Sequence, residues 1–201
     1  MKRRTLDMIA TAGGAVLVIV LVVAGALLVW GARFANDDVH SQLARQEIYF
    51  PTAAEFAHAK PGTEITPTMK PYMLQYAGQQ LLTGQQAEVY ADHFIAIHLS
   101  EMPYGGVYAK ISAASRANPT TAKLAALVTV SFKGTTLRGL LLEAYAFSVF
   151  GEIASVAALA SFVLAGVMLI LTLLGLLHLR RVPDDAEFPR VHRSDEVLQP
   201  V

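Results

Sequence analysis

The sequence predicts an all-α membrane protein, in which two transmembrane helices form a hairpin and a small helical extracytoplasmic domain is inserted between the spans. The composition is apolar, with 54% hydrophobic residues and a mean hydropathy of +0.43. The apolar residues are concentrated in two uncharged runs, 8–30 and 153–177. As a helix, each run is long enough to cross a hydrocarbon layer of about 30 Å. The segment between them has the length of one modest domain and shows helical periodicity.

The first run, 8–30, follows the short basic segment 1–7, MKRRTLD. This arrangement fits either a secretory signal or a membrane anchor. Cleavable signals have an apolar region of about 7 to 15 residues that ends in small residues, whereas this run is longer and ends in Leu-Leu-Val-Trp. The sequence therefore favours an uncleaved helix that places Trp30 at the membrane interface, where indole rings are enriched.

The second run, 153–177, is the stretch around which the rest of the chain is organised. Its apolar pattern continues upstream to Thr135, so the helix is expected to project beyond the bilayer as a stalk. Arg138, Glu143 and Glu152 lie on this stalk. The centres of both runs carry no charged residue, which argues against an ion pathway, a proton relay or a transporter.

The flanking charges predict the orientation of the two helices. Basic residues precede the first run, and Arg180 and Arg181 follow the second, whereas Arg33 and Glu152 flank the opposite ends. The positive-inside rule then places both termini in the cytoplasm and residues 31–152 outside. The last segment, 178–201, is mixed in charge and poor in periodic apolar residues, so a disordered cytoplasmic tail is expected.

Local signals divide the segment between the runs. Pro51 to Pro71 contains four prolines and predicts a loop, and Pro71 to Thr83 has helical spacing. Thr83 and Gln86 have the spacing of a capping box, which predicts the start of an amphipathic helix that ends before Pro103.

The last helix of the domain is predicted from its two ends. Asn118 followed by Pro119 is typical of a helix cap and its first helical position. Lys133 and Gly134 have the character of a helix stop, so Thr135 is expected to start the stalk as a separate helix.

Histidines and carboxylates gather on the amphipathic helix. His93 and His98 are five residues apart, or about 140° around a regular helix, and cannot both bind one ion from an undistorted helix. Glu88 and Asp92 share a face that is expected to be solvated. A metal or catalytic role is the less favoured interpretation, because no metal motif is matched.

The sequence contains no motif for other catalytic or binding functions. The chain has no Cys, which excludes disulfides and thiolate sites, and its formal net charge is zero. There is no phosphate-binding loop, nucleophile elbow or basic aromatic surface for nucleic acid. We therefore expect no catalytic residue, no cofactor, no metal and no nucleic-acid partner.

Small residues recur in the apolar runs at a spacing of four. Such a strip lets helix backbones approach closely, either within the hairpin or in contact with another subunit. The alternative explanation is composition, because Ala and Gly are abundant throughout the chain. The helix-packing candidates are Ala154, Ala157, Ala158, Ser161 and Ala165 in the second run and Ala10 and Gly14 in the first.

Four segments carry a resemblance to known sequences: QEIYFP (Gln46–Pro51), GQQLLTGQQAEVYADHFIAIHL (Gly78–Leu99), YAKISAAS (Tyr108–Ser115) and GTTLRGLLLEAY (Gly134–Tyr145). Over nearly its whole length the chain resembles an uncharacterised family of two-span actinobacterial membrane proteins. Some similar proteins carry automatic names of the aromatic ring-opening dioxygenase type, but the spacing of a two-His-one-carboxylate iron site is not found here. The resemblance implies a two-span topology in a bacterial plasma membrane and no particular function.

We hypothesise a non-enzymatic integral membrane protein that acts as an accessory or structural subunit, in the lipid bilayer, by packing against other membrane proteins or another copy of itself. One alternative is an extracytoplasmic ligand-binding or sensing module, which predicts a concave apolar pocket with a few convergent polar groups. A weaker alternative is a metal-assisted enzyme that uses His93 or His98.

Overall fold

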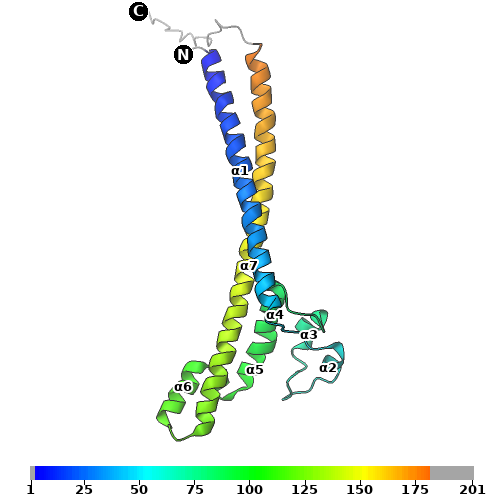
Figure 1. Ribbon diagram of the computed structural model, residues 1–201, viewed down its shortest axis with the longest axis vertical. Helices are drawn as coiled ribbons and strands as arrows, with labels where there is room; N and C mark the ends of the chain where they lie inside the picture. Colours follow the sequence, from blue (N-terminus) through cyan, green and yellow to red (C-terminus); the bar gives the residue numbers. More distant parts are fainter. Residues whose placement is uncertain (1–2, 182–201) are drawn as a thin grey trace, which may run out of the picture. The chain divides into compact units, whose positions relative to one another are not determined.

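The computed structural model describes residues 3–181, and the elements formed by these residues are all helical (Figure 1). The only β-type pairing in this range is an isolated antiparallel bridge between Tyr49 and Gln80. The predicted all-α class is confirmed. The helices are α1 (Arg3–Ala44), α2 (Ala53–Ala57), α3 (Lys70–Met73), a 3₁₀ turn (Leu74–Tyr76), α4 (Gly84–Tyr90), a π-helical turn (Ala91–Ile95), α5 (Ala96–Glu101), a 3₁₀ turn (Pro103–Gly106), α6 (Tyr108–Ala117) and α7 (Ala122–Leu179).

The chain divides into two compact units. Unit 1 consists of Met1–Leu28 and Ala157–Val201, and unit 2 consists of Val29–Val156. Both long helices, α1 and α7, contribute residues to each unit. The tail expected over 178–201 is still helical as far as Leu179, and its part from residue 182 onward lies outside the described residues.

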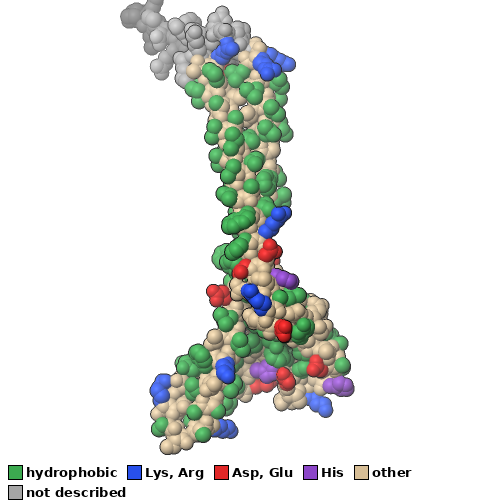
Figure 2. Space-filling model, viewed as in Figure 1, with side chains coloured by type: hydrophobic (Ala, Val, Ile, Leu, Met, Phe, Trp, Pro, Cys, Tyr) green, Lys and Arg blue, Asp and Glu red, His purple; other side chains and the backbone are tan. Residues whose placement is uncertain are grey.

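Unit 1 is an antiparallel pair formed by α1 and α7, in which Thr11 lies against Gly175 and Gly14 against Thr172. The most apolar windows of the two helices have mean hydropathies of 2.8 and 2.6, and only 6% and 17% of their residues are buried. The core helix of a soluble protein would be mostly buried, whereas here hydrophobic side chains cover the visible face of the unit (Figure 2). Both helices are therefore long enough and apolar enough to cross a membrane.

Unit 2 has a core of large side chains. In its main cluster, those exposed by 2% or less are Leu43, Phe50, Phe56, Met69, Met73 and Leu81. They come from the end of α1, from the segment that follows it and from the short helices, and Leu141 of α7 packs in the same cluster. This core holds together segments that lie far apart in the sequence.

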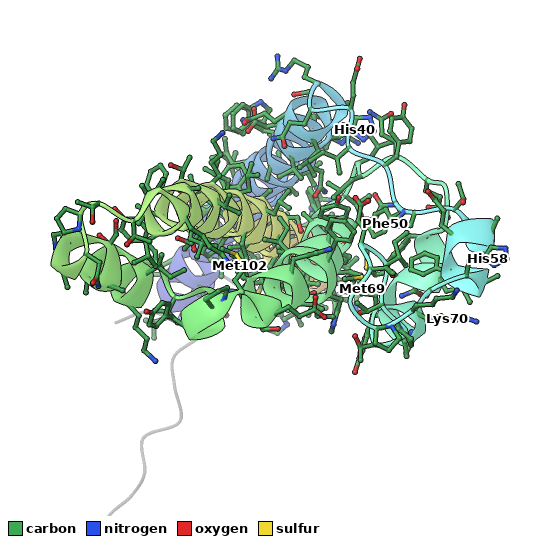
Figure 3. The ribbon with its side chains drawn as sticks, turned by 90° about the horizontal axis from the view of Figure 1, so that it is seen from below. His40, Phe50, His58, Met69, Lys70 and Met102 are labelled. Carbon is green, nitrogen blue, oxygen red and sulfur yellow. The ribbon has the colours of Figure 1, made fainter. Side chains whose placement is uncertain are left out.

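The segment predicted as a proline-rich loop contains one helical turn, α2. Thr52 and Glu55 form a capping box at its start, in which the Glu55 carboxylate accepts the Thr52 backbone N–H at 2.7 Å. Phe56 and Met69 anchor the segment in the core. Figure 3 shows Phe50 and Met69 on the inner side of this region and His58 and Lys70 at its outer margin.

The predicted capping box at the start of α4 is confirmed. The Thr83 hydroxyl accepts the Gln86 backbone N–H at 3.2 Å, and the Gln86 side-chain oxygen accepts the Thr83 N–H at 3.1 Å. Gln86 is 7% exposed, and its amide also donates to Gln79 Oε1. This buried side chain therefore satisfies backbone donors that the helix start leaves without partners.

The predicted helix stop at Lys133 and Gly134 is wrong, because α7 runs unbroken from Ala122 to Leu179. Gly134 does not end the helix. It allows the Leu99 side chain to pack closely against α7, because a Cβ atom at Gly134 would lie 2.8 Å from Leu99 Cδ2. The stalk expected from Thr135 is therefore the middle of one helix.

Two other predicted boundaries are also wrong. Asn118 closes α6 instead of opening the next helix, since its backbone N–H and its side-chain amide both donate to the Ala114 carbonyl. The helix expected over Pro71–Thr83 ends at Tyr76, and Gly78 then adopts a φ of 70° in the turn that leads to the bridge at Gln80.

Candidate functional site

The predicted helix-packing residues occupy different depths of the α1–α7 contact. Ala158 and Ala165 are exposed by 2% and 4%, and the Gly14 backbone lies against Thr172. Ala154, Ala157 and Ser161 are half-buried, and Ala10 is exposed. The structure thus places Ala158, Ala165 and Gly14 in the helix contact and leaves Ala10 at its margin.

The buried positions follow a seven-residue repeat instead of the predicted spacing of four. On the unit 1 part of α7 the buried residues are Ala158, Ala165 and Thr172, and on α1 Thr11 and Gly25 are buried. Alternating steps of four and three keep one seam of a helix against its partner, as in a left-handed coiled coil. The sequence signal that could have revealed this face is the heptad recurrence of small and hydroxyl residues.

Polar side chains gather at one end of unit 1, a feature that sequence reasoning missed. Asp7 and Thr11 of α1 and Thr172 and His178 of α7 line a notch of about 230 Å³. His178 Nε2 lies 3.9 Å from Asp7 Oδ2, which makes a long ion pair when the imidazole is protonated.

The histidines of the amphipathic helix have separate partners in unit 2. The His93 ring stacks on Tyr72 with centroids 3.6 Å apart and an interplanar angle of 2°. His98 Nδ1 lies 2.7 Å from the Phe94 carbonyl oxygen. Among residues 3–181, no group of three or more His, Cys, Asp or Glu side chains is placed to hold a metal ion.

The helix that carries these histidines is distorted, contrary to the regular geometry assumed from the sequence. Ala91 to Ile95 form a π-helical turn between α4 and α5. A π-helical turn contains more residues than an α-helical turn, so the 140° separation expected for His93 and His98 does not apply.

Asp92 is paired across unit 2 and does not form the solvated face expected with Glu88. Arg138 Nη2 of α7 donates to Asp92 Oδ1 at 2.6 Å. The side chains are 40% and 38% exposed, so solvent screening limits the pair to about 0.2–1 kcal/mol. Of the other stalk residues, Glu152 accepts a hydrogen bond from Gln85 Nε2, and Glu143 lines a surface groove.

That groove has a volume of about 400 Å³. Asp38 and Glu143 supply carboxylates, and Val39, Leu140 and Phe147 supply apolar walls. The arrangement suits a ligand that is apolar on one side and cationic on the other.

Two ionisable groups in unit 2 have shifted pKa values. Burial, with a smaller contribution from the nearby Glu64 carboxylate, raises the pKa of Tyr90 to about 12. The phenol packs edge-on against Phe50 and stacks on Phe94. The backbone and side-chain hydrogen bonds from Thr52 lower the pKa of the exposed Glu55 carboxyl.

Comparison with known proteins gives no assignment for these sites, since no family model, curated protein or solved structure matches the chain.

Proposed function

We propose that the chain is a non-enzymatic two-span protein of the bacterial plasma membrane that acts as an accessory or structural subunit, packing against other membrane proteins or another copy of itself. In this proposal both termini are cytoplasmic and residues 31–152 are extracytoplasmic. The proposal draws its topology from the two apolar helices, from the flanking basic residues and from the resemblance to two-span proteins.

The observation that carries the subunit role is a set of large apolar side chains on the unit 2 part of α7. Val130, Leu137, Leu140 and Phe150 are 49–67% exposed, although unit 2 buries other large side chains completely. Residues 130–140 precede the predicted span and would have no lipid to cover them. Large apolar side chains exposed outside lipid are typical of surfaces that contact another protein.

The topology is tested with single cysteines, because the natural chain contains none. Ala113→Cys on α6 and Thr5→Cys on α1 change exposed residues. In intact cells a membrane-impermeant maleimide should label the first variant and label the second only after the membrane is permeabilised. Labelling of Thr5→Cys in intact cells, or protection of Ala113→Cys, would reject the proposed orientation.

The subunit role is tested with a photo-crosslinking residue at Leu137 or Leu140 in cells. We expect discrete adducts of higher mass, identified by mass spectrometry as another membrane protein or as a second copy of the chain. The same residue at Lys110, an exposed polar position on α6, is the matched control and should give no discrete adduct. A chain that remains monomeric, with equal background at all three positions, contradicts the subunit role.

The groove lined by Asp38 and Glu143 favours a second candidate function, an extracytoplasmic binding or sensing module for a cationic amphiphile. Its carboxylates lie beside apolar walls in a volume of about 400 Å³, within the range usual for small-molecule sites. Glu143→Gln should weaken binding of such a compound, and Glu101→Gln, at an exposed position outside the groove, should not. Equal binding by the two variants would remove this candidate.

A further inference from the structure

The notch in unit 1 contains two buried polar atoms that have no hydrogen-bond partner among the described residues. Asp7 Oδ2 and Thr172 Oγ1 are both inaccessible to solvent and make no hydrogen bond within residues 3–181. His178 Nε2 lies 3.9 Å from Asp7 Oδ2, which is too long for a hydrogen bond. A buried carboxylate oxygen without a donor is costly, so a donor from outside residues 3–181 is expected there.

Thr172 differs from its counterpart on α1. Thr11 Oγ1 donates to the Asp7 carbonyl one turn earlier, at 2.7 Å, as helical threonines commonly do. Thr172 is 7% exposed and makes no such bond. Its hydroxyl is therefore left without a hydrogen-bond partner among residues 3–181.

Two glycines bring these polar groups into the helix contact. A Cβ atom at Gly14 would lie 2.7 Å from Thr172 Oγ1, and one at Gly175 would lie 2.8 Å from Thr11 Oγ1. Any larger residue at either position would have to displace a hydroxyl that lines the notch. The notch is thus a consequence of close helix packing, and its remaining walls include the apolar side chains of Met168 and Leu171.

We propose that this notch binds a primary ammonium group, namely the headgroup of an ethanolamine phospholipid. The inference rests on the proposed membrane insertion. An ammonium group offers N–H donors to the Asp7 carboxylate and the Thr172 hydroxyl. A volume of about 230 Å³ suits a headgroup and is smaller than a drug-sized ligand site.

The position along the sequence also suits a lipid headgroup. Asp7 directly precedes the first apolar run, and His178 directly follows the second. In a pair of membrane-spanning helices these positions lie at the level of the headgroups. Arg180 and Arg181 follow within one turn and would favour the lipid phosphate. A choline headgroup has no N–H donor and should bind poorly.

The test compares lipids retained by the purified full-length protein after detergent extraction from equimolar ethanolamine and choline phospholipids. Native mass spectrometry counts the bound lipids. We expect the ethanolamine lipid to be retained about tenfold over the choline lipid, and Asp7→Asn to remove that preference, because one charge-assisted hydrogen bond corresponds to about a tenfold change in affinity. Thr172→Val should reduce it by a few-fold.

Matched controls use the same substitutions outside the notch. Asp37→Asn and Thr5→Val change exposed residues and should retain the full preference. Equal retention of the two lipids by the natural chain, or an unchanged preference in Asp7→Asn, would overturn the inference. Displacement of the lipid by an equal concentration of free ethanolamine would also overturn it, since the site would then recognise a soluble amine.

Extraction of the membranes with alkaline carbonate separates failure of this inference from failure of the proposed function. Release of the natural chain into the supernatant would reject the membrane-spanning proposal itself. A chain that stays in the membrane but shows no preference for the ethanolamine lipid would reject only the headgroup site. Circular dichroism of each variant establishes that a lost preference does not reflect lost helix.

Discussion

The two units of this molecule distribute large and small side chains in opposite ways. In unit 2 the residues least exposed to solvent include Phe56, Met69 and Met73. In unit 1 the buried positions are small or polar, such as Ala158, Ala165 and Thr172, while large apolar side chains such as Leu159 and Ile170 are 60–67% exposed. The same chain thus follows two packing rules.

The surroundings proposed for the two units, lipid for unit 1 and water for unit 2, would explain this difference. In water, burying a Leu or Phe side chain contributes about 1.5–3 kcal/mol, so a soluble core collects large residues. In lipid the outside is as apolar as the inside, and helices associate through close backbone contact and small residues. Unit 1 follows the second rule and unit 2 the first, which supports the proposal that unit 1 lies in the bilayer.

The largest effect is expected from a substitution that disrupts the core of unit 2. Phe56→Ala removes a ring that is 1% exposed and should cost about 3–5 kcal/mol, because it deletes the anchor of the 51–69 segment and leaves a cavity. Faster cleavage by a glutamate-specific protease after the exposed Glu64 and a lower thermal midpoint would report this loss. Phe150→Ala, at a ring that is 67% exposed, should change stability by less than about 0.5 kcal/mol. Equal effects of the two variants would contradict the assignment of the core.

The next prediction tests whether unit 1 lies in lipid and unit 2 in water. It places the same lysine at two valines of similar exposure, one in each unit. Val163→Lys places a charge near the middle of the second span and should cost about 2.5–3.5 kcal/mol in membrane insertion. Val130→Lys should have little effect on insertion. The exposed fractions are 57% and 54%, so exposure alone does not distinguish the sites. Glycosylation-site mapping measures the inserted fraction, and tolerance of Lys at residue 163 would remove unit 1 from the bilayer.

A smaller effect tests the close contact in unit 1 with two adjacent glycines. Gly14→Val would push a side chain against Thr172 Oγ1 and should destabilise the helix pair by about 1–3 kcal/mol. Gly13→Val is the control. It replaces a helical glycine by the same residue, but a Cβ atom at Gly13 meets no atom within 4 Å and therefore causes no clash. Thermal unfolding in detergent should separate the two variants. If both behave alike, the seam does not run through Gly14.

The sequence was a good guide to features set by a short stretch of chain. The two uncharged runs predicted the long apolar helices, and Thr83 with Gln86 predicted the start of α4. In each case the deciding interactions lie within a few residues. Local chemistry therefore decides the outcome before tertiary contacts contribute.

Features that depend on distant partners could not be predicted. From the sequence alone Gly134 has the character of a helix stop, and only the structure shows that Leu99 lies against it. Asn118 caps the C-terminus of α6, because the chain turns before α7 begins. The notch likewise requires the register between Gly14 and Thr172. Tertiary packing overrides local propensity at such positions, and one sequence does not reveal which partner lies opposite.

The last prediction uses tyrosine ionisation, which reports on unit 2 alone because all seven tyrosines lie within Val29–Val156. Tyr90, with its pKa raised to about 12 by burial, should remain protonated at the pH near 10 at which a tyrosine in water ionises. Since unfolding restores the ordinary pKa, the Tyr90 contribution to stability is full below about pH 10 and is lost as the pH rises toward 12. The difference in phenolate absorbance between the natural chain and Tyr90→Phe measures this step. A difference spectrum with its midpoint near pH 10 would show that the unit 2 core admits water at Tyr90, and the contrast between the two units would then rest on unit 1 alone.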